Sequence, residues 1–162
     1  PRDCTTPAMA DYRLASSVGR PADNCLALAR LIVRGIFEEF PKLKLVATHL
    51  GGGICEVIGR MNYAYTMQEE AFFLGSYEPM LIRHEPLHYL KMCYLDTVCY
   101  HLPAARCVVE SVGADRVIFG TDAPPLTGIK EKGLQMIYDL GLAPLDQQKI
   151  LSGNAKRLLK LG

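Results

Sequence analysis

The fold is decided by the stretch KLKLVATHLGGG at residues 42–53. Residues 42–48 read as a short strand whose Leu45–Ala47 run suits burial on both faces. His49 stands at the carboxyl end of this strand. Three glycines then let the backbone turn sharply into the amphipathic helical pattern of residues 54–65. A short apolar strand followed at once by a helix indicates a β/α unit.

Two further strands are predicted downstream, CYLDTV at residues 93–98 and RVIFG at residues 116–120. A helix starting at Pro103 follows the first of them. Helical patterns over residues 128–140 and 145–161 follow the second. Strands that alternate with helices predict an α/β fold with a parallel sheet.

The remaining segments complete a single predicted domain over residues 1–162. An amphipathic helix from Asp23 to Phe40 precedes the first strand, and Pro41 ends it. The predicted organisation is a loop at 1–21, the first strand with its two helices at 22–66, an irregular insertion at 67–92 with a short helix near 87–91, and the last two strands with the C-terminal helices at 93–162.

Composition excludes several classes of protein. The 162 residues carry 18 basic and 17 acidic side chains, so the basic excess expected of a nucleic-acid-binding protein is absent. No apolar run is long enough to span a bilayer, and the N-terminus lacks a signal-peptide pattern. The six cysteines form no Cys-X-X-Cys pair and read as buried thiols in a reducing compartment, which predicts a cytoplasmic location.

Polar residues stand at the carboxyl end of each predicted strand: His49, then Asp96 with Thr97, then Asp122. Parallel sheets place functional groups at these ends. An imidazole and a carboxylate there can ligate a divalent metal or pass protons. For His49 a structural hydrogen bond is the alternative. The adjacent glycines, which lack a Cβ atom, favour backbone held close to another group. Phosphate binding is one interpretation of them, but neither a Walker lysine nor a Gly-X-Gly-X-X-Gly spacing is present.

The other candidates also have two interpretations. Asp122 lies in GTDAPP, directly after a buried strand, and favours a functional role over an Asx turn or helix cap. Asp96 could orient a catalytic group or serve as a structural hydrogen-bonding residue. His101 is a candidate substrate contact, with helix capping or solvent exposure as the alternative.

The motif HEPLH at residues 84–88 fits the zinc-protease pattern His-Glu-X-X-His. That chemistry requires both histidines on one face of a continuous helix. Pro86 disfavours helix at the residue before it, which places His84 ahead of the helix. We interpret the motif as a chance match.

Three motifs together resemble one known family. They are FPKLKLVATHLGG at residues 40–52, VIFGTDAP at 117–124 and ILSGNAKRLL at 150–159. In this order they resemble the amidohydrolase-related family, which includes aminocarboxymuconate semialdehyde decarboxylase and the resorcylate-type decarboxylases.

The resemblance implies the C-terminal part of a TIM-type (β/α)8 barrel, with three parallel strands and their helices. His49 resembles the sixth-strand histidine, which polarises or protonates substrate. Asp122 resembles the eighth-strand aspartate, which ligates the metal and handles protons, and Asp96 with Thr97 matches the end of the seventh strand. The implied cofactor is one divalent metal of the Zn²⁺ class. The implied function is a carboxy-lyase (decarboxylase) or hydrolase of a small aromatic or ring-opened carboxylate.

The sequence also departs from the family pattern. The opening His-X-His pair and the fifth-strand metal histidine are absent, and a complete barrel takes about 250 residues. We therefore expect a C-terminal portion of such an enzyme, with an incomplete ligand set and doubtful activity alone. Exposed sheet edges predict a homo-oligomer. The alternative is a non-catalytic oligomerising or binding domain derived from the half-barrel.

Overall fold

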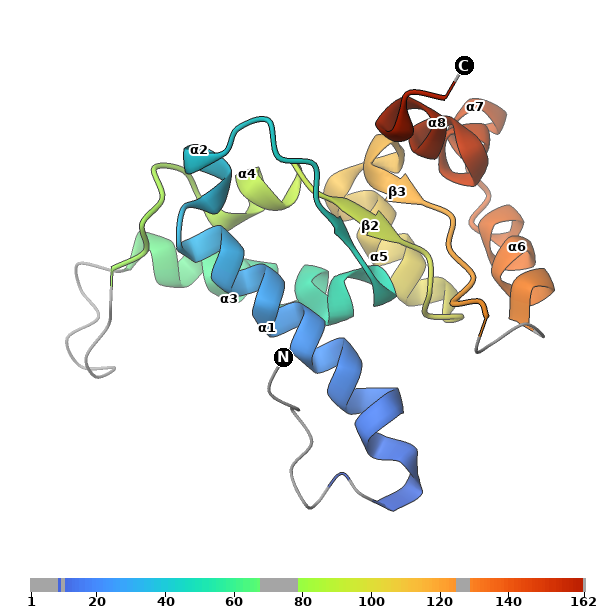
Figure 1. The fold of residues 1–162 in the computed structure, drawn as a ribbon, viewed down its shortest axis with the longest axis horizontal. Coiled ribbons are helices and arrows are strands. Elements are labelled where there is room, and N and C mark those ends of the chain that lie inside the picture. Colours follow the sequence, from blue (N-terminus) through green and yellow to red (C-terminus); the bar gives the residue numbers. More distant parts are fainter. Residues whose placement is uncertain (1–8, 10, 68–78, 125–128, 162) are drawn as a thin grey trace. The chain divides into compact units, whose positions relative to one another are not determined.

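The computed structural model describes residue 9 and residues 11–67, 79–124 and 129–161 (Figure 1). The single predicted domain divides into two compact units. The first comprises Pro1–Leu43 with Gly52–Met92, and the second comprises Lys44–Gly51 with Cys93–Gly162. All the predicted site residues belong to the second unit.

The second unit is built on a parallel sheet in the order β1-β2-β3 (Figure 1). The strands are β1 (Val46–Ala47), β2 (Tyr94–Asp96) and β3 (Val117–Ile118). Ala47 pairs with Leu95, and Leu95 pairs with Val117. The carboxyl ends of all three strands therefore lie on the same side of the sheet, as the sequence predicts.

Helices and short helical turns complete the second unit. They are α5 (Leu102–Val112), η6 (Ala114–Arg116), α6 (Lys130–Asp139), α7 (Pro144–Gln148), the π-helical segment η8 (Lys149–Gly153) and α8 (Asn154–Leu159). The core contains Leu95 and Ile150, both fully buried, and Val108 and Val117, each 1% exposed. Burial of these apolar side chains is the main source of the unit's stability.

The two edges of the sheet differ. On the β3 side, the Phe119 N–H donates to the Ile150 carbonyl oxygen at 2.9 Å. The Asn154 side chain donates to the Val117 carbonyl oxygen at 2.7 Å. Within the described ranges, the backbone of β1 has no hydrogen-bond partner beyond β2. The helical segments at the C-terminal end thus cover one edge and leave the other open.

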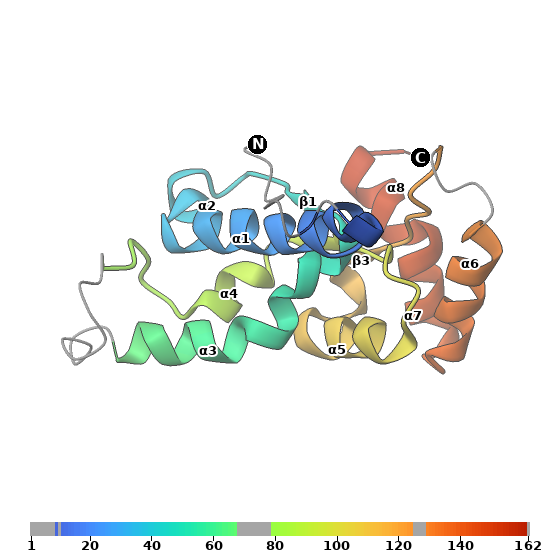
Figure 2. The ribbon, with the colours of Figure 1, turned by 90° about the horizontal axis from the view of Figure 1, so that it is seen from below.

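The first unit is helical. It contains η2 (Asp11–Arg13), the π-helical segment η3 (Ala15–Gly19), α1 (Arg20–Val33), α2 (Ile36–Glu39), α3 (Ile54–Thr66) and α4 (Pro86–Leu90). Helix α4 lies between α1 and α3 and contacts both (Figure 2). Their shared core includes Ile32, Ile54 and Leu90, all fully buried.

Several predicted elements have different bounds. The predicted loop 1–21 is helical from Asp11 onward, although residues 1–8 and 10 lie outside the described part. The helix predicted over 23–40 starts at Arg20 and breaks after Val33, because the backbone turns left-handed at Gly35. Residues 68–78 of the predicted insertion also lie outside the described part.

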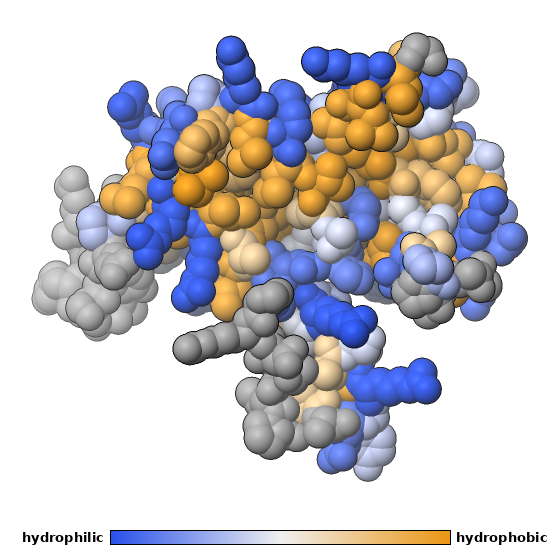
Figure 3. All heavy atoms as spheres, viewed as in Figure 1, coloured by the Kyte–Doolittle hydropathy of each residue, from blue (hydrophilic) through white to orange (hydrophobic). Residues whose placement is uncertain are grey.

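The predicted strands shorten to two or three residues each, and the burial predicted for the first one is wrong. Val46 is 41% exposed, because β1 is an edge strand with an uncovered side. Hydrophobic side chains reach the molecular surface elsewhere as well (Figure 3). In the second unit these include Leu145 and Leu159. None of the described helices combines the length and apolar character needed to cross a membrane.

Candidate active site

The residues that follow β1 form a left-handed turn, η4 (His49–Gly53). All five have positive φ, from 51° at Leu50 to 95° at Gly53. Residues other than glycine adopt this conformation at a cost of roughly 1–2 kcal/mol each. His49 and Leu50 therefore carry backbone strain at the carboxyl end of β1. Strain of this kind is common at functional sites.

The structure shows what the second of the three glycines approaches. A Cβ atom on Gly52 would lie 1.8 Å from the Pro21 carbonyl oxygen and 2.9 Å from the Cys25 amide nitrogen. The backbone therefore approaches helix α1, and the close approach itself excludes a side chain. The backbone at Gly52 is thus held close to another group, as the glycines predict, and that group is helix α1.

Asp96, the last residue of β2, holds the left-handed turn. Its Oδ1 atom accepts hydrogen bonds from the backbone N–H groups of Leu50, at 3.2 Å, and Val98, at 3.0 Å. The backbone amide and the charge of His49 also act on this carboxylate. Both interpretations of Asp96 drawn from the sequence remain compatible with these contacts.

Burial changes the acidity of Asp96. The residue is 8% exposed, and the loss of hydration raises the pKa of its carboxyl group. The amides of Val98 and Leu50 and the charge of His49 act in the opposite direction, because each stabilises the ionised form. Burial has the larger effect, so the pKa of Asp96 is raised overall.

The loop that follows β3 is attached to β2 through Thr97. The Thr97 hydroxyl accepts from the Gly120 N–H at 3.1 Å and donates to the Gly120 carbonyl oxygen at 3.4 Å. A Cβ atom on Gly120 would lie 3.1 Å from Cγ2 of Val98 and 3.3 Å from Cβ of Asp96. Glycine thus allows the end of β3 to approach the end of β2 closely.

Tyr100 makes a second attachment to the same loop. Its hydroxyl donates to the Thr121 carbonyl oxygen at 3.1 Å, next to Asp122. Burial raises the pKa of Tyr100, and the negative charges of Asp122 and Asp96 raise it further. Tyr100 and Asp122 both have positive φ, 57° and 55°. The sequence gives no signal for Tyr100, because its role depends on a contact with a residue 21 positions away.

The structure brings some of the predicted residues together. Asp96 interacts with the His49 turn, and the negative charges of Asp96 and Asp122 both act on the Tyr100 hydroxyl. His49 and Asp122 follow β1 and β3, which lie two strand spacings apart, or about 10 Å. His101 is exposed and stands at the N-cap of α5 without a side-chain capping bond. The structure shows no contact that assigns it to substrate.

The described residues do not form a complete metal centre. Across the described ranges, no group of three or more His, Cys, Asp or Glu side chains is placed to hold a metal ion. Zinc sites in proteins use three or four protein ligands. Asp122 can supply one carboxylate ligand. The described residues therefore do not provide enough ligands to hold a zinc ion.

The HEPLH motif is not a zinc-protease site. Glu85 is the extended N-cap residue of α4, and Pro86 begins that helix, so His84 precedes it as the sequence predicts. The rings of His84 and His88 lie 4.5 Å apart. His88 also contacts the ring of Tyr89 edge-on.

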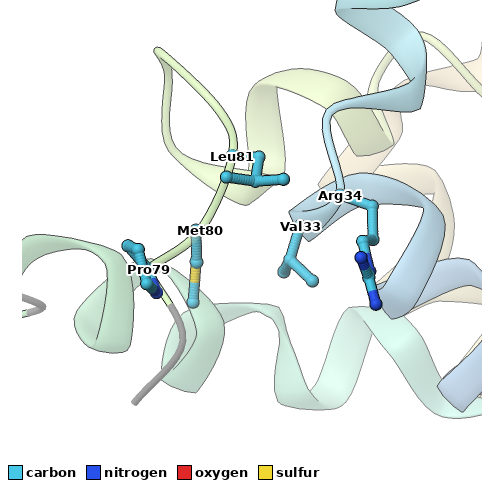
Figure 4. Close-up of a pocket in the computed structure, with 5 residues that line it drawn as sticks. All are labelled: Val33, Arg34, Pro79, Met80 and Leu81. Atoms are coloured by element: carbon cyan, nitrogen blue, oxygen red, sulfur yellow. The ribbon is translucent and has the colours of Figure 1, made fainter.

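The first unit contains a groove, whereas the predicted site residues belong to the second unit. It has a volume of about 360 Å³ and is lined by Val33, Arg34, Pro79, Met80 and Leu81 (Figure 4). The described residues of this lining offer no carboxylate, imidazole or thiol for proton transfer at neutral pH. The candidate active site is therefore the carboxyl edge of the sheet, and not this groove.

The chain is similar to known decarboxylases. It is 29% identical over 154 residues to 2-amino-3-carboxymuconate-6-semialdehyde decarboxylase of Dictyostelium discoideum, covering 94% of this chain and 41% of that protein. The chain therefore spans about two fifths of the length of this relative.

Two solved structures share the fold. The 5-carboxyvanillate decarboxylase LigW of Sphingomonas paucimobilis has a TM-score of 0.79 at 24% identity, with 96% of this chain and 45% of that chain covered. A dihydroxybenzoic acid decarboxylase of Polaromonas, with bound manganese and 2-nitroresorcinol, has a TM-score of 0.78 at 22% identity, with 99% and 48% covered. These matches confirm the predicted fold class, part of a TIM-type barrel with three parallel strands.

A family model establishes the family of this chain. The model described as Amidohydrolase matches residues 4–161, which is nearly the entire chain. The chain therefore belongs to the amidohydrolase family.

Proposed function

We propose that this chain is the part of a metal-dependent carboxy-lyase that carries its proton-handling histidine and one metal-ligating aspartate. The substrate class is a small aromatic or ring-opened carboxylate. His49 is the proton donor or base, and Asp122 is the metal ligand. The aromatic and ring-opened acids named for the similar decarboxylases support this substrate class.

One observation carries the proposal. His49 and Asp122 both follow parallel strands at the same edge of the sheet, and both have left-handed backbone. Strained backbone clusters at active sites, and parallel sheets place functional groups at the carboxyl ends of their strands. About 10 Å separates the two strands, with β2 between them.

The chemical roles follow from the side-chain types. An imidazole can deliver a proton to the carbon that loses carbon dioxide, or accept one from water. A divalent metal, when bound, would supply a positive charge that holds the substrate's oxygen atoms. Because decarboxylation and hydrolysis need the same two groups, hydrolysis of a small carboxylated substrate is the second candidate reaction.

Reconstitution tests this proposal. The chain is incubated with Zn²⁺ or Mn²⁺, and bound metal is quantified in the wild type and in Asp122→Asn. Release of carbon dioxide from hydroxybenzoates is then measured for the wild type and for His49→Gln. Metal bound by the wild type and lost in Asp122→Asn, with turnover lost in His49→Gln, supports the proposal. Metal binding that is unchanged in Asp122→Asn contradicts the role of that residue.

A non-catalytic oligomerising domain is the alternative function. The open edge of β1 and the exposed Val46 favour it. Light scattering distinguishes the two functions when it is combined with the assays above. A stable oligomer that neither binds metal nor turns over substrate supports the alternative. The cytoplasmic location remains a prediction.

A further inference from the structure

We infer that Asp96 is a positioning residue for His49. Its buried carboxylate holds the left-handed backbone from which the imidazole projects. The catalytic meaning of this inference rests on the proposed function, whereas the physical contact does not. His49 and Leu50, in the loop after β1, and Asp96, at the end of β2, are the three residues involved.

The backbone at His49 and Leu50 is strained. His49 has φ 54° and Leu50 has φ 51°, and neither has the glycine freedom of the next three residues. Something outside the turn must stabilise this conformation, because the local preference of both residues opposes it. The partner that the structure provides is the Asp96 carboxylate, which accepts the Leu50 N–H at 3.2 Å.

The acceptor of the Leu50 N–H is a carboxylate and not a neutral oxygen. An ionised carboxylate makes hydrogen bonds about twice as strong as those of a neutral oxygen. It also attracts the positive charge of His49, which a neutral side chain would not do. A carboxylate at 8% exposure is costly to bury. A residue that only closed the loop could be a neutral acceptor at lower cost.

The backbone that carries the Asp96 carboxylate is rigid. Asp96 is the last residue of the central strand, and its Oδ1 is also fixed by the Val98 N–H at 3.0 Å. The next residue, Thr97, is 1% exposed and bonds to Gly120 on the other side. The carboxylate therefore sits on backbone that is attached on both flanks. A group with this support can set the direction of a neighbouring side chain.

Nuclear magnetic resonance of the uniformly labelled chain tests the inference without metal or substrate. Asp96→Asn keeps the size and one acceptor oxygen but removes the charge. We expect exchange of the Leu50 amide to accelerate about tenfold, since a charged hydrogen bond is replaced by a neutral one. We also expect the ring signals of His49 to move, while those of His84 and His88 stay in place.

Thr97→Val is the matched control. It removes a buried polar group from the neighbouring position, but its partner is Gly120 on the opposite side. Exchange of the Gly120 amide should accelerate, and the signals of Leu50 and His49 should not change. The inference is overturned if Asp96→Asn leaves the Leu50 exchange and the His49 ring signals at their wild-type values. It is equally overturned if Thr97→Val changes them as much.

The result is independent of the reaction. If the chain neither binds metal nor releases carbon dioxide, the proposed function fails, and the contact between Asp96 and the His49 turn is still measured. If the signals of His49 ignore Asp96 while the enzyme assays succeed, only the positioning role fails.

Discussion

The loops after β1 and β3 are attached to the same strand end by different chemistry. After β1, the backbone N–H of Leu50 binds the Asp96 carboxylate. After β3, Gly120 and Thr121 bind the hydroxyls of Thr97 and Tyr100. One side thus depends on a buried charge and the other on neutral groups. The two sides should respond differently to substitution and to pH.

Asp96→Ala should have the largest effect. It removes the acceptor from two backbone N–H groups, and a buried donor without a partner costs about 1–3 kcal/mol. Relief of the buried charge offsets part of this loss. We expect the free energy of unfolding in urea to fall by about 2–3 kcal/mol. An unchanged urea midpoint would show that the Leu50 and Val98 amides find other partners.

Gly120→Ala should be next, and it acts on the β3 side. The new Cβ atom would meet side-chain atoms of Val98 and Asp96 at 3.1 and 3.3 Å, closer than nearly all real contacts. We expect a loss of about 2 kcal/mol in the urea experiment, as is typical of overpacking. Gly59→Ala is the control, because nothing lies within 4 Å of that position in helix α3. Equal losses in both variants would refute the explanation.

Thr97→Val should cost about 1 kcal/mol, because it removes both hydroxyl bonds to Gly120 and keeps the side-chain shape. The loss should be smaller than that of Asp96→Ala in the same urea titration. A larger loss would reverse the comparison and make the neutral side the stronger attachment.

Tyr100→Phe should cost about 0.5 kcal/mol, since one partly exposed bond to the Thr121 carbonyl is lost. The amide signals of Thr121 and Asp122 should shift in the nuclear magnetic resonance spectrum, and that of Leu50 should not. A shift at Leu50 of similar size would mean that the two loops are not attached independently.

The smallest effect is expected in the pH dependence, because the amides and the His49 charge partly oppose the effect of burial on Asp96. The pKa of Asp96 is raised in the folded state, so the folded chain holds this proton more tightly than the unfolded chain. Stability from this group is present below the ordinary Asp pKa of about 3.9 and is lost as pH rises through the folded pKa.

Asp96→Asn removes this titration. The stability of the wild type relative to Asp96→Asn should therefore decline in urea unfolding as the pH rises from about 4 through the folded pKa of Asp96. The difference between the wild type and Thr97→Val should stay constant over this range, because no charge is involved. A wild-type advantage over Asp96→Asn that grows with pH would show that the pKa of Asp96 is lowered.

Much of the second unit could be predicted from the sequence. Apolar runs that alternate with helical periodicity identify the three strands and place His49, Asp96 and Asp122 at their carboxyl ends. Helix α5 follows the predicted spacing within a residue or two, and so does helix α3 of the first unit. These features are local, so a single sequence contains them.

The rest depends on contacts between distant segments. The left-handed conformation of His49 and Leu50 contradicts their local preference and is stabilised from a residue 46 positions away. The glycine at position 52 is required by the backbone of Pro21, which no motif reveals. The attachment of Tyr100 to Thr121 likewise follows from the sheet order and not from spacing.

The two edge strands of the sheet differ in whether a further strand can pair with them. Residues of η8 and α8 occupy the hydrogen-bonding groups beyond β3, whereas in the described part of the chain those beyond β1 are free of backbone partners. A strand that joins this sheet therefore joins next to Val46. If it runs parallel, its carboxyl end arrives beside His49 and not beside Asp122. A parallel strand that extends the sheet at β1 therefore also brings new side chains next to the imidazole of His49.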